Sequence, residues 1–326
     1  RGKTFKMIDW FKIELMNRPA AEIRQKLDFI KPVNMKTGEI LGTFEICYLR
    51  RHNEPESAIS VKIFPSGRVW VQGSIHKFWH GQNHSILTHS EMQKAFAFLF
   101  KTLGTRPESS KFLQIEFALN LYPDFNPDEF INRLICFKTK PFEGLGNFEK
   151  IGKRCYNSEY DMKIYNKGKQ YKLKQNVLRI EKKVKDSRYL KRFGICAVSD
   201  LTTLKTRELL LDLFTSIDDL LIDDKSIDES RITARQVLAL AKYRNPNFWS
   251  EISKRERYKA KERFQNLILK FGSEKYLNTV KNLAQKESKN ISGKGDFSEH
   301  NKKVERGTFP KFKYGSETSF SEANKY

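Results

Sequence analysis

One strand-like segment places a tyrosine between two lysines. In the stretch 160–167 (YDMKIYNK), strict alternation puts Lys163, Tyr165 and Lys167 on one face. A phenol flanked by ammonium groups suits attack on a phosphate, because nearby cations favour the phenolate and hold the anionic substrate. We therefore interpret Tyr165 as a candidate nucleophile, with Lys163 and Lys167 lowering its pKa and stabilising charge on the phosphorus.

Two carboxylates are expected on the same surface. Glu181 lies on the polar face of the next expected strand, and Glu116 on that of an earlier one. Carboxylate oxygens suit Mg²⁺ or Mn²⁺, and such an ion could polarise a phosphodiester. The alternative is that both glutamates are solvated, with Glu181 paired to Arg179 or Lys183.

A histidine-containing segment could complete a metal site. His76, His80 and His84 recur every four residues, but Gly81 and the short length argue against a helical three-histidine zinc site. The histidine–hydrophobic–histidine triplet of many tyrosine nicking enzymes does not occur in the sequence. We take His76 and Asn83 as candidate ligands beside the two glutamates.

The positive charge of the chain is concentrated around the tyrosine segment. The net charge is +22, and residues 150–192 contain 15 Lys and Arg against four acidic residues. Because so few acidic residues balance this charge, a phosphate-binding surface is favoured over an ordinary solvated face. Binding to an anionic membrane is the weaker alternative, because no segment combines this charge with a strongly apolar face. Tyrosine, metal and basic surface together predict a DNA-nicking enzyme. The predicted DNA contacts are Arg179, Lys182, Lys183, Lys185, Arg188, Lys191 and Arg192.

The elements that must position these groups form an α+β domain. Alternating strands and a few helices without βαβ repetition predict a mostly antiparallel central sheet. The expected strands are 7–14, 44–50, 58–64, 69–71 and 112–121, followed by the segments that begin at Tyr160 and Val177. In 112–121 the alternation predicts that Leu113, Ile115, Phe117 and Leu119 face the core. The expected helices are 20–30, 90–103 and 126–136.

Helical spacing dominates after about Phe193. Apolar residues recur at three to four positions in 203–214, 233–243, 247–271 and 274–285. We therefore predict three regions: a catalytic domain (1–192), a helical domain (193–287), and a disordered tail (288–326) that is rich in Gly, Ser, Lys and Glu. The basic helix in 247–270 could also lie along DNA phosphates.

The chain is expected in the cytoplasm. It contains no apolar run long enough to span a bilayer, and its first ten residues hold no apolar core of a secretory signal. Its four cysteines are far apart and form no CxxC pair, which is typical of reduced thiols.

Several segments, in the same order, resemble the replication-initiator family of filamentous phages, the gene II type. Residues 81–83 (GQN) resemble its Gly-His-Asn element, and 114–116 (QIE) stand where it has Arg-Ile-Asp. Residues 164–167 (IYNK) resemble its Tyr-Leu-Lys segment. The most specific likeness is 178–181 (LRIE) with 188–194 (RYLKRFG), similar to the family's Arg-Phe-Glu and Arg-Tyr-Leu-Lys-Ser-Phe-Gly run.

The resemblance implies an HUH-endonuclease-like nicking domain that starts rolling-circle replication in a bacterial host cell. It implies Tyr165 as nucleophile, Glu116 and Glu181 at a Mg²⁺ or Mn²⁺ site, and a 5′-phosphotyrosine that is later rejoined. Its partners would be double- and single-stranded origin DNA, a host helicase and a polymerase. Two alternatives remain: a non-catalytic plasmid initiator that only binds and opens the origin, and a mobilisation relaxase or transposase with the same tyrosine chemistry.

Overall fold

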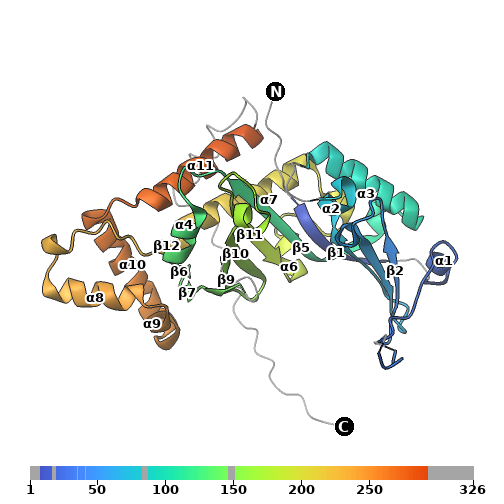
Figure 1. The fold of residues 1–326 in the computed structure, drawn as a ribbon, viewed down its shortest axis with the longest axis horizontal. Helices are drawn as coiled ribbons and strands as arrows, with labels where there is room; N and C mark the ends of the chain where they lie inside the picture. Colours follow the sequence, from blue (N-terminus) through green and yellow to red (C-terminus); the bar gives the residue numbers. More distant parts are fainter. Residues whose placement is uncertain are drawn as a thin grey trace, which may run out of the picture. The chain divides into compact units, whose positions relative to one another are not determined.

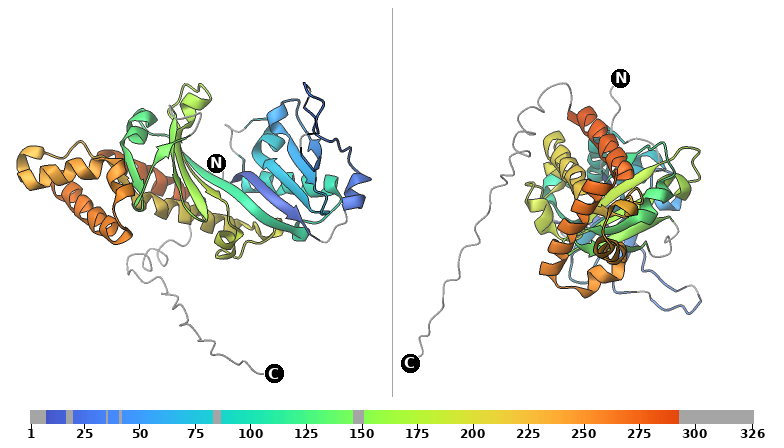
Figure 2. Two further views of the ribbon diagram at one scale, coloured as in Figure 1. Left: turned by 90° about the horizontal axis from the view of Figure 1, so that it is seen from below. Right: turned by 90° about the vertical axis from the view of Figure 1, so that its left-hand side faces the viewer.

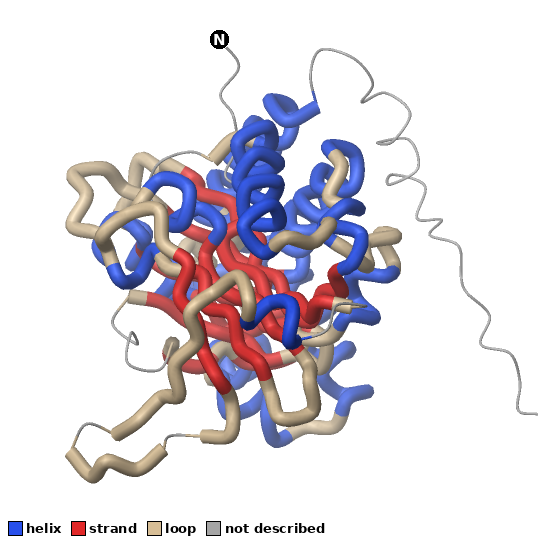
Figure 3. The backbone as a smooth tube through the Cα atoms, turned by 90° about the vertical axis from the view of Figure 1, so that its right-hand side faces the viewer, coloured by secondary structure: helices blue, strands red, loops and turns tan. Residues whose placement is uncertain are grey.

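The computed structural model describes residues 8–16, 20–34, 36–40, 42–82, 87–145 and 151–292. Of residues 290–292 only the backbone is described. Within this part the fold is α+β with a large antiparallel sheet, as predicted. Figure 3 shows the strands, in red, gathered between helices, in blue. No helix of the described chain has the length and apolar character needed to cross a bilayer.

Nine strands form the main sheet, in the order β2-β3-β4-β1-β5-β11-β10-β9-β8. All neighbours in this sheet run antiparallel. The strands are β1 (Ile8–Leu15), β2 (Glu45–Leu49), β3 (Ile59–Ile63), β4 (Val69–Ser74), β5 (Ser110–Leu121), β8 (Glu143–Gly144), β9 (Gly152–Tyr156), β10 (Tyr160–Asn166) and β11 (Leu178–Val184) (Figure 1). A smaller sheet pairs β12 (Leu220–Ile222), β6 (Leu134–Phe137) and β7 (Lys140–Pro141).

Helices pack on the apolar face of the main sheet. The longer helices of this layer are α3 (His89–Leu103) beside β1 and α7 (Thr203–Thr215) beside β5. Phe96 of α3 meets Phe11 of β1 edge to face, with ring centroids 5.1 Å apart. Five shorter α-helices precede α7 in the described part of the chain: α1 (Ala20–Arg24), α2 (Ile75–His80), α4 (Pro127–Arg133), α5 (Lys167–Gln170) and α6 (Ser187–Lys191).

The long strand β5 joins the two halves of the sheet (Figure 2, left). Its predicted alternation is confirmed for Ile115 and Phe117, which are buried. At its start, however, Ile13 pairs with Phe112 and Lys12 with Gln114, so that the register shifts by one residue. Phe112 is therefore fully buried, and the prediction that Leu113 faces the core is wrong because alternation breaks at a bulge.

Three of the predicted helices have different boundaries in the structure. The predicted helix 90–103 begins at His89, because Thr88 and Glu91 form a capping box. The helix predicted for 126–136 ends at Arg133, because β6 pairs with β12 and β7 from Leu134 onward. The helix expected over 20–30 ends at Arg24.

The C-terminal helices contribute to two cores. These helices are α8 (Ala234–Arg244), α9 (Pro246–Glu251), α10 (Lys254–Phe271) and α11 (Lys275–Ser292). The segment expected as one helix over 247–271 is divided, since Ser253 caps α10. α8, α9 and α10 enclose Trp249 and Phe264, whereas Leu213 of α7 and Val280 of α11 belong to the core of the main sheet. The domain boundary near residue 193 stays a prediction. Of the predicted tail, 288–292 lie in α11 and the rest lies outside the described residues.

Candidate functional site

Three adjacent strands bring the predicted nucleophile and both predicted acids together. β10, β11 and β5 are neighbours, and on their polar face Lys163 stands opposite Glu181 in the strand pairing. Lys183 stands opposite Glu116 on the same face. Tyr165 belongs to this face as well, because it is two residues beyond Lys163 on β10.

The side chains of this face form a continuous polar network. The Tyr165 hydroxyl donates to Oε2 of Glu181 at 3.3 Å. Lys163 Nζ lies 2.8 Å from Oε1 of Glu181 and 3.3 Å from Oε2 of Glu116, so that its ammonium bridges the two carboxylates. Lys183 Nζ is 3.1 Å from the other oxygen of Glu116.

A buried arginine anchors the network to β1. The Arg179 side chain is fully buried; its Nε donates to Oε2 of Glu181 at 2.9 Å and its Nη2 to Oδ2 of Asp9 at 2.8 Å. Its Nη1 donates to Asn120 at 3.1 Å, and Ser74 donates to Asp9 at 3.1 Å. Three cationic and three anionic side chains are thus joined across β1, β5, β11 and β10.

Asp9 was not predicted, and no local pattern identifies it. In the β1–β5 pairing Ile8 lies opposite Phe117 and Trp10 opposite Glu116, so Asp9 is an extra residue at a β-bulge. The bulge redirects its side chain, which reaches Arg179 about 170 residues away along the chain. The place of Asp9 in the network therefore depends on the pairing of strands that are distant in the sequence.

The environment of Tyr165 raises its pKa, contrary to the prediction. Only 8% of the residue is exposed. Burial raises the pKa of the phenol well above its ordinary range, and the opposing charge of Arg179 only partly offsets this. The ammonium of Lys163 is paired with the two glutamates in this structure, and its predicted role in charge stabilisation stays a prediction.

Lys167 does not flank Tyr165 on a strand. β10 ends at Asn166, whose side chain caps α5, and Lys167 is the first residue of that helix. Lys167 is buried, with its Nζ 5.5 Å from the centre of the Tyr171 ring. The predicted alternation therefore fails at its last position, because a helix cap ends the strand.

The two glutamates have opposite pKa shifts. Burial and the charge of Glu181 raise the pKa of Glu116, despite Lys163 and Lys183. Burial also raises the pKa of Glu181, but Lys163 and Arg179 outweigh it and hold that pKa at about 2. Glu181 is consequently a stable anion at neutral pH.

The residues present do not fit a divalent ion between Glu116 and Glu181. Each carboxylate already has a cation at both oxygens, so a metal would have to displace the ammonium of Lys163. The predicted ligand His76 is fully buried in α2, with its ring 5.3 Å from that of His80, and Asn83 lies outside the described residues. Within the described ranges no group of three His, Cys, Asp or Glu side chains could hold a metal.

The predicted DNA contacts divide into buried and exposed residues. Arg179 and Lys182 are buried, so their assignment to an exposed phosphate-binding surface is wrong. Lys182 lies on the opposite, helix-covered face, where its Nζ meets the Tyr189 hydroxyl at 3.1 Å and the carboxylate of Asp212. The others are partly or fully exposed: Lys183, Lys185, Arg188, Lys191 and Arg192.

The backbone of β9 closely approaches the tyrosine. Gly152 pairs with Tyr165, and a Cβ added at Gly152 would lie 2.4 Å from the Tyr165 Cβ. We expect Gly152→Ala to lower the free energy of unfolding by about 2 kcal/mol, because the strand must move to relieve the clash. Urea unfolding would measure this, with Gly144→Ala on exposed β8 as the matched control. Equal stability of the two variants would contradict this close approach.

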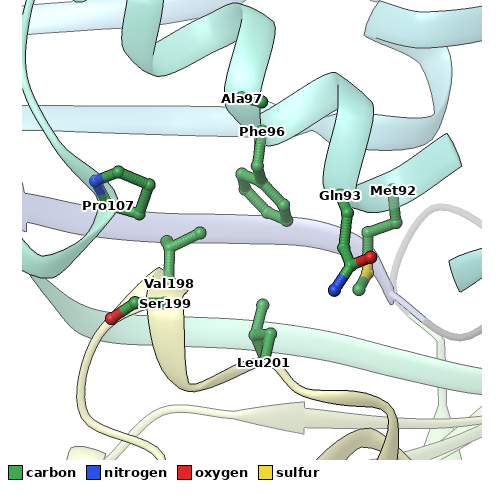
Figure 4. Close-up of a pocket in the computed structure, with 8 residues that line it drawn as sticks. All are labelled: Met92, Gln93, Phe96, Ala97, Pro107, Val198, Ser199 and Leu201. Atoms are coloured by element: carbon green, nitrogen blue, oxygen red, sulfur yellow. The ribbon is translucent and has the colours of Figure 1, made fainter. Parts of the chain in front are cut away.

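One pocket of the described chain lies away from the network. It has a volume of about 180 Å³ and lies between α3 and residues 198–201 (Figure 4). Its lining is largely apolar, with Gln93 and Ser199 the polar contributors, and it shares no residue with the polar network. It therefore offers no additional group for chemistry at Tyr165.

Comparisons with known proteins assign no family. No protein-family model matches the chain, and no curated protein is significantly similar to it.

Proposed function

We propose that this chain is a DNA nicking and rejoining enzyme that initiates rolling-circle replication. The observation that carries the proposal is the hydrogen bond from Tyr165 to Glu181 within a face that also holds Lys163 and Arg179. A phenol next to fixed cations is suited to phosphoryl transfer, where positioning and charge stabilisation dominate catalysis. The family-like segments around Tyr165 and Glu181 point the same way.

The proposed reaction exchanges one phosphate ester for another. The Tyr165 oxygen attacks the phosphorus, the new O–P bond forms, and the bond from phosphorus to the 3′ oxygen breaks. The phenolic proton is lost and the leaving 3′ oxygen gains one. The products are a 5′-phosphotyrosine and a free 3′-hydroxyl, and because the bond energy is retained, rejoining needs no ATP.

The cations next to the phenol would stabilise charge in this reaction. Lys163 and Arg179 both contact Glu181, the carboxylate that accepts the phenolic hydrogen bond. An incoming phosphate could therefore compete with Glu181 and Glu116 for Lys163. Mg²⁺ or Mn²⁺ dependence remains a proposal. The reaction described above uses only cations of the chain, because both carboxylates are already paired with Lys163, Lys183 and Arg179.

The direct test is a nicking assay on supercoiled DNA carrying the candidate origin, with Mg²⁺, Mn²⁺ or EDTA. Relaxation of the DNA with transfer of a label to the protein would support the proposal. Metal dependence would indicate that Lys163 is displaced on binding, whereas activity in EDTA would indicate that the ammonium suffices. Tight binding without cleavage would contradict the enzymatic proposal.

The pKa shifts predict how nicking depends on pH. Because the pKa of Tyr165 is raised, the phenol is neutral at pH 7, and because that of Glu181 is lowered, its carboxylate is a weak base. The reactive phenolate then becomes more abundant as pH rises, and we expect the single-turnover rate to increase about tenfold per unit between pH 7 and 9. DNA affinity measured at each pH is the control. A flat profile would instead mean that Glu181 takes the proton in the rate-limiting step.

One observation favours a second candidate function, a non-catalytic initiator that binds and opens origin DNA. The charges of the polar network are balanced and Tyr165 is nearly buried, which suits a structural core. Such a protein would need neither the tyrosine hydroxyl nor a metal. Under either proposal the partners are origin DNA and, in the cytoplasm of a bacterial host, a helicase and a polymerase. The nicking assay does not distinguish a replication initiator from a relaxase or a transposase. Identifying the DNA target would distinguish them.

A further inference from the structure

The polar face of the sheet continues beyond the network onto the N-terminal strands, where it becomes aromatic and basic. Here Trp10 stands opposite Glu116, and Lys62 stands opposite Trp70. We call this surface the outer face. All of its side chains are partly or fully exposed. The outer face comprises Trp10, Lys12, Lys62, Phe64, Arg68, Trp70 and Lys183.

The aromatic side chains of the outer face lie beside cations. The rings of Phe64 and Trp70 meet edge to face at 4.4 Å. Lys12 Nζ lies 3.4 Å from the centre of the Trp70 ring, and the guanidinium of Arg68 lies 5.3 Å from it. Flat π surfaces and positive charges therefore lie side by side across β1, β3 and β4.

The positive charge of the outer face is incompletely balanced. Arg68 is paired with both oxygens of Glu14, at 2.6 and 2.9 Å. In the described part of the chain, neither Lys12 nor Lys62 has a carboxylate within ion-pair distance. Burial, followed by repulsion from Lys62, Arg68 and Lys183, lowers the pKa of Lys12. An anion bound among these cations would relieve that repulsion.

The indole of Trp70 has an unused hydrogen-bond donor. Its Nε1 is shielded from solvent and has no partner among the described residues. A buried donor without an acceptor costs free energy, and a ligand oxygen could satisfy it once the side chains that cover it move aside. This observation is independent of charge.

We propose that the outer face binds single-stranded nucleic acid, with bases stacked on Trp70 and phosphates held by Lys12 and Lys62. Stacking on aromatic side chains within a basic groove is how sequence-tolerant single-strand binding is achieved. A duplex fits less well, because its bases are already stacked and would leave the aromatic rings unused. An acidic protein would use the lysines but not the rings.

Lys183 connects this surface to the candidate site. Its Nζ is 5.3 Å from the centre of the Trp10 ring and 3.1 Å from Glu116, which in turn contacts Lys163. A strand lying along the outer face would thus be led towards Tyr165. That the strand is DNA rests on the proposed function; the binding surface itself does not.

The test uses the full chain carrying Tyr165→Phe, so that binding is measured without cleavage. Fluorescence anisotropy with a labelled 12-nucleotide oligo-dT would compare Trp70→Ala, Trp70→Phe and Lys12→Gln. We expect Trp70→Ala to weaken binding about tenfold and Trp70→Phe to retain most of the affinity, because a phenyl ring still stacks. Lys12→Gln should weaken binding and reduce its salt dependence. Lys101→Gln, exposed on α3, is the matched charge control.

Thermal unfolding of each variant would confirm that it folds. Unchanged oligo-dT affinity in folded Trp70→Ala and Lys12→Gln would overturn the proposal. So would an equal loss of duplex and single-strand affinity in Trp70→Ala, because stacking would then not be the cause. If the chain binds oligo-dT through these residues but never cuts DNA, the binding surface is supported and the nickase is refuted. If the chain cuts DNA and neither cutting nor oligo-dT binding changes in these variants, the nickase is supported and the binding surface is refuted.

Discussion

Replacement of Tyr165 with phenylalanine is expected to abolish both nicking and covalent attachment of DNA. The substitution keeps the ring and removes the hydroxyl that donates to Glu181. Because Lys163 and Arg179 still pair with Glu181, the cost in stability should be only about 1 kcal/mol. A loss of activity of about a thousandfold or more would then report the missing nucleophile rather than unfolding, since each tenfold in rate corresponds to roughly 1.4 kcal/mol.

The measurement is single-turnover cleavage of an end-labelled oligonucleotide, with the covalent product resolved on a denaturing gel. Tyr156→Phe is the matched control, because Tyr156 is 46% exposed on neighbouring β9 and belongs to the same basic region. Normal attachment in Tyr165→Phe together with its loss in Tyr156→Phe would move the nucleophile to β9. Full activity in both variants would remove the tyrosine mechanism.

Local alternation predicted the strands that carry the site. Ile115 and Phe117 of β5, and Met162 and Ile164 of β10, are buried as the period of two requires. The alternate positions of each strand, which include Glu116 and Tyr165, then lie on the opposite face of the sheet. Alternation therefore predicts that these two side chains share one surface if their strands are close together. The period of two does not reveal which strands are neighbours.

Tertiary pairing and burial explain what the sequence could not predict. Asp9 enters the network through a bulge between strands about 100 residues apart, for which no local signal exists. The sequence marks Arg179 as a cation, but only the packed sheet shows that it is buried between two acids. The same burial reverses the expected pKa shift of Tyr165, because desolvation of the phenol outweighs the nearby positive charge.

The predicted end of one helix is wrong for a different reason. Residues 126–136 have helical spacing throughout, yet Leu134 begins a strand that pairs with residues 220–222. Helix propensity is weak compared with pairing and burial, so the distant strand decides the conformation. By contrast, the break within 247–271 is encoded locally, because Ser253 and Glu256 form a capping box that starts a new helix.

Loss of the buried arginine should be the most destabilising change in the network. Arg179→Met keeps much of the side-chain volume but leaves Asp9 and Glu181 buried without their shared cation. Removing one partner of a buried ion pair typically costs about 3–5 kcal/mol, because the remaining charge is uncompensated. Urea unfolding at pH 7 measures this, and Arg188→Met is the control. Arg188 pairs with Asp186 but is 77% exposed, so its loss should leave the free energy of unfolding nearly unchanged.

The cost of Arg179→Met should shrink as the pH falls. In the wild type the pKa of Glu181 is lowered, so its contribution to stability is present above the unfolded pKa and lost as the pH falls towards about 2. Without Arg179, burial is opposed by Lys163 alone, and the folded pKa of Glu181 rises. Protonation of Glu181 then relieves the variant at a higher pH than the one at which it weakens the wild type. The two unfolding free energies should therefore converge as the pH falls from 7 through the ordinary glutamate pKa of 4.5 towards 2. A difference that is independent of pH would mean that Arg179 stabilises the sheet through packing rather than charge.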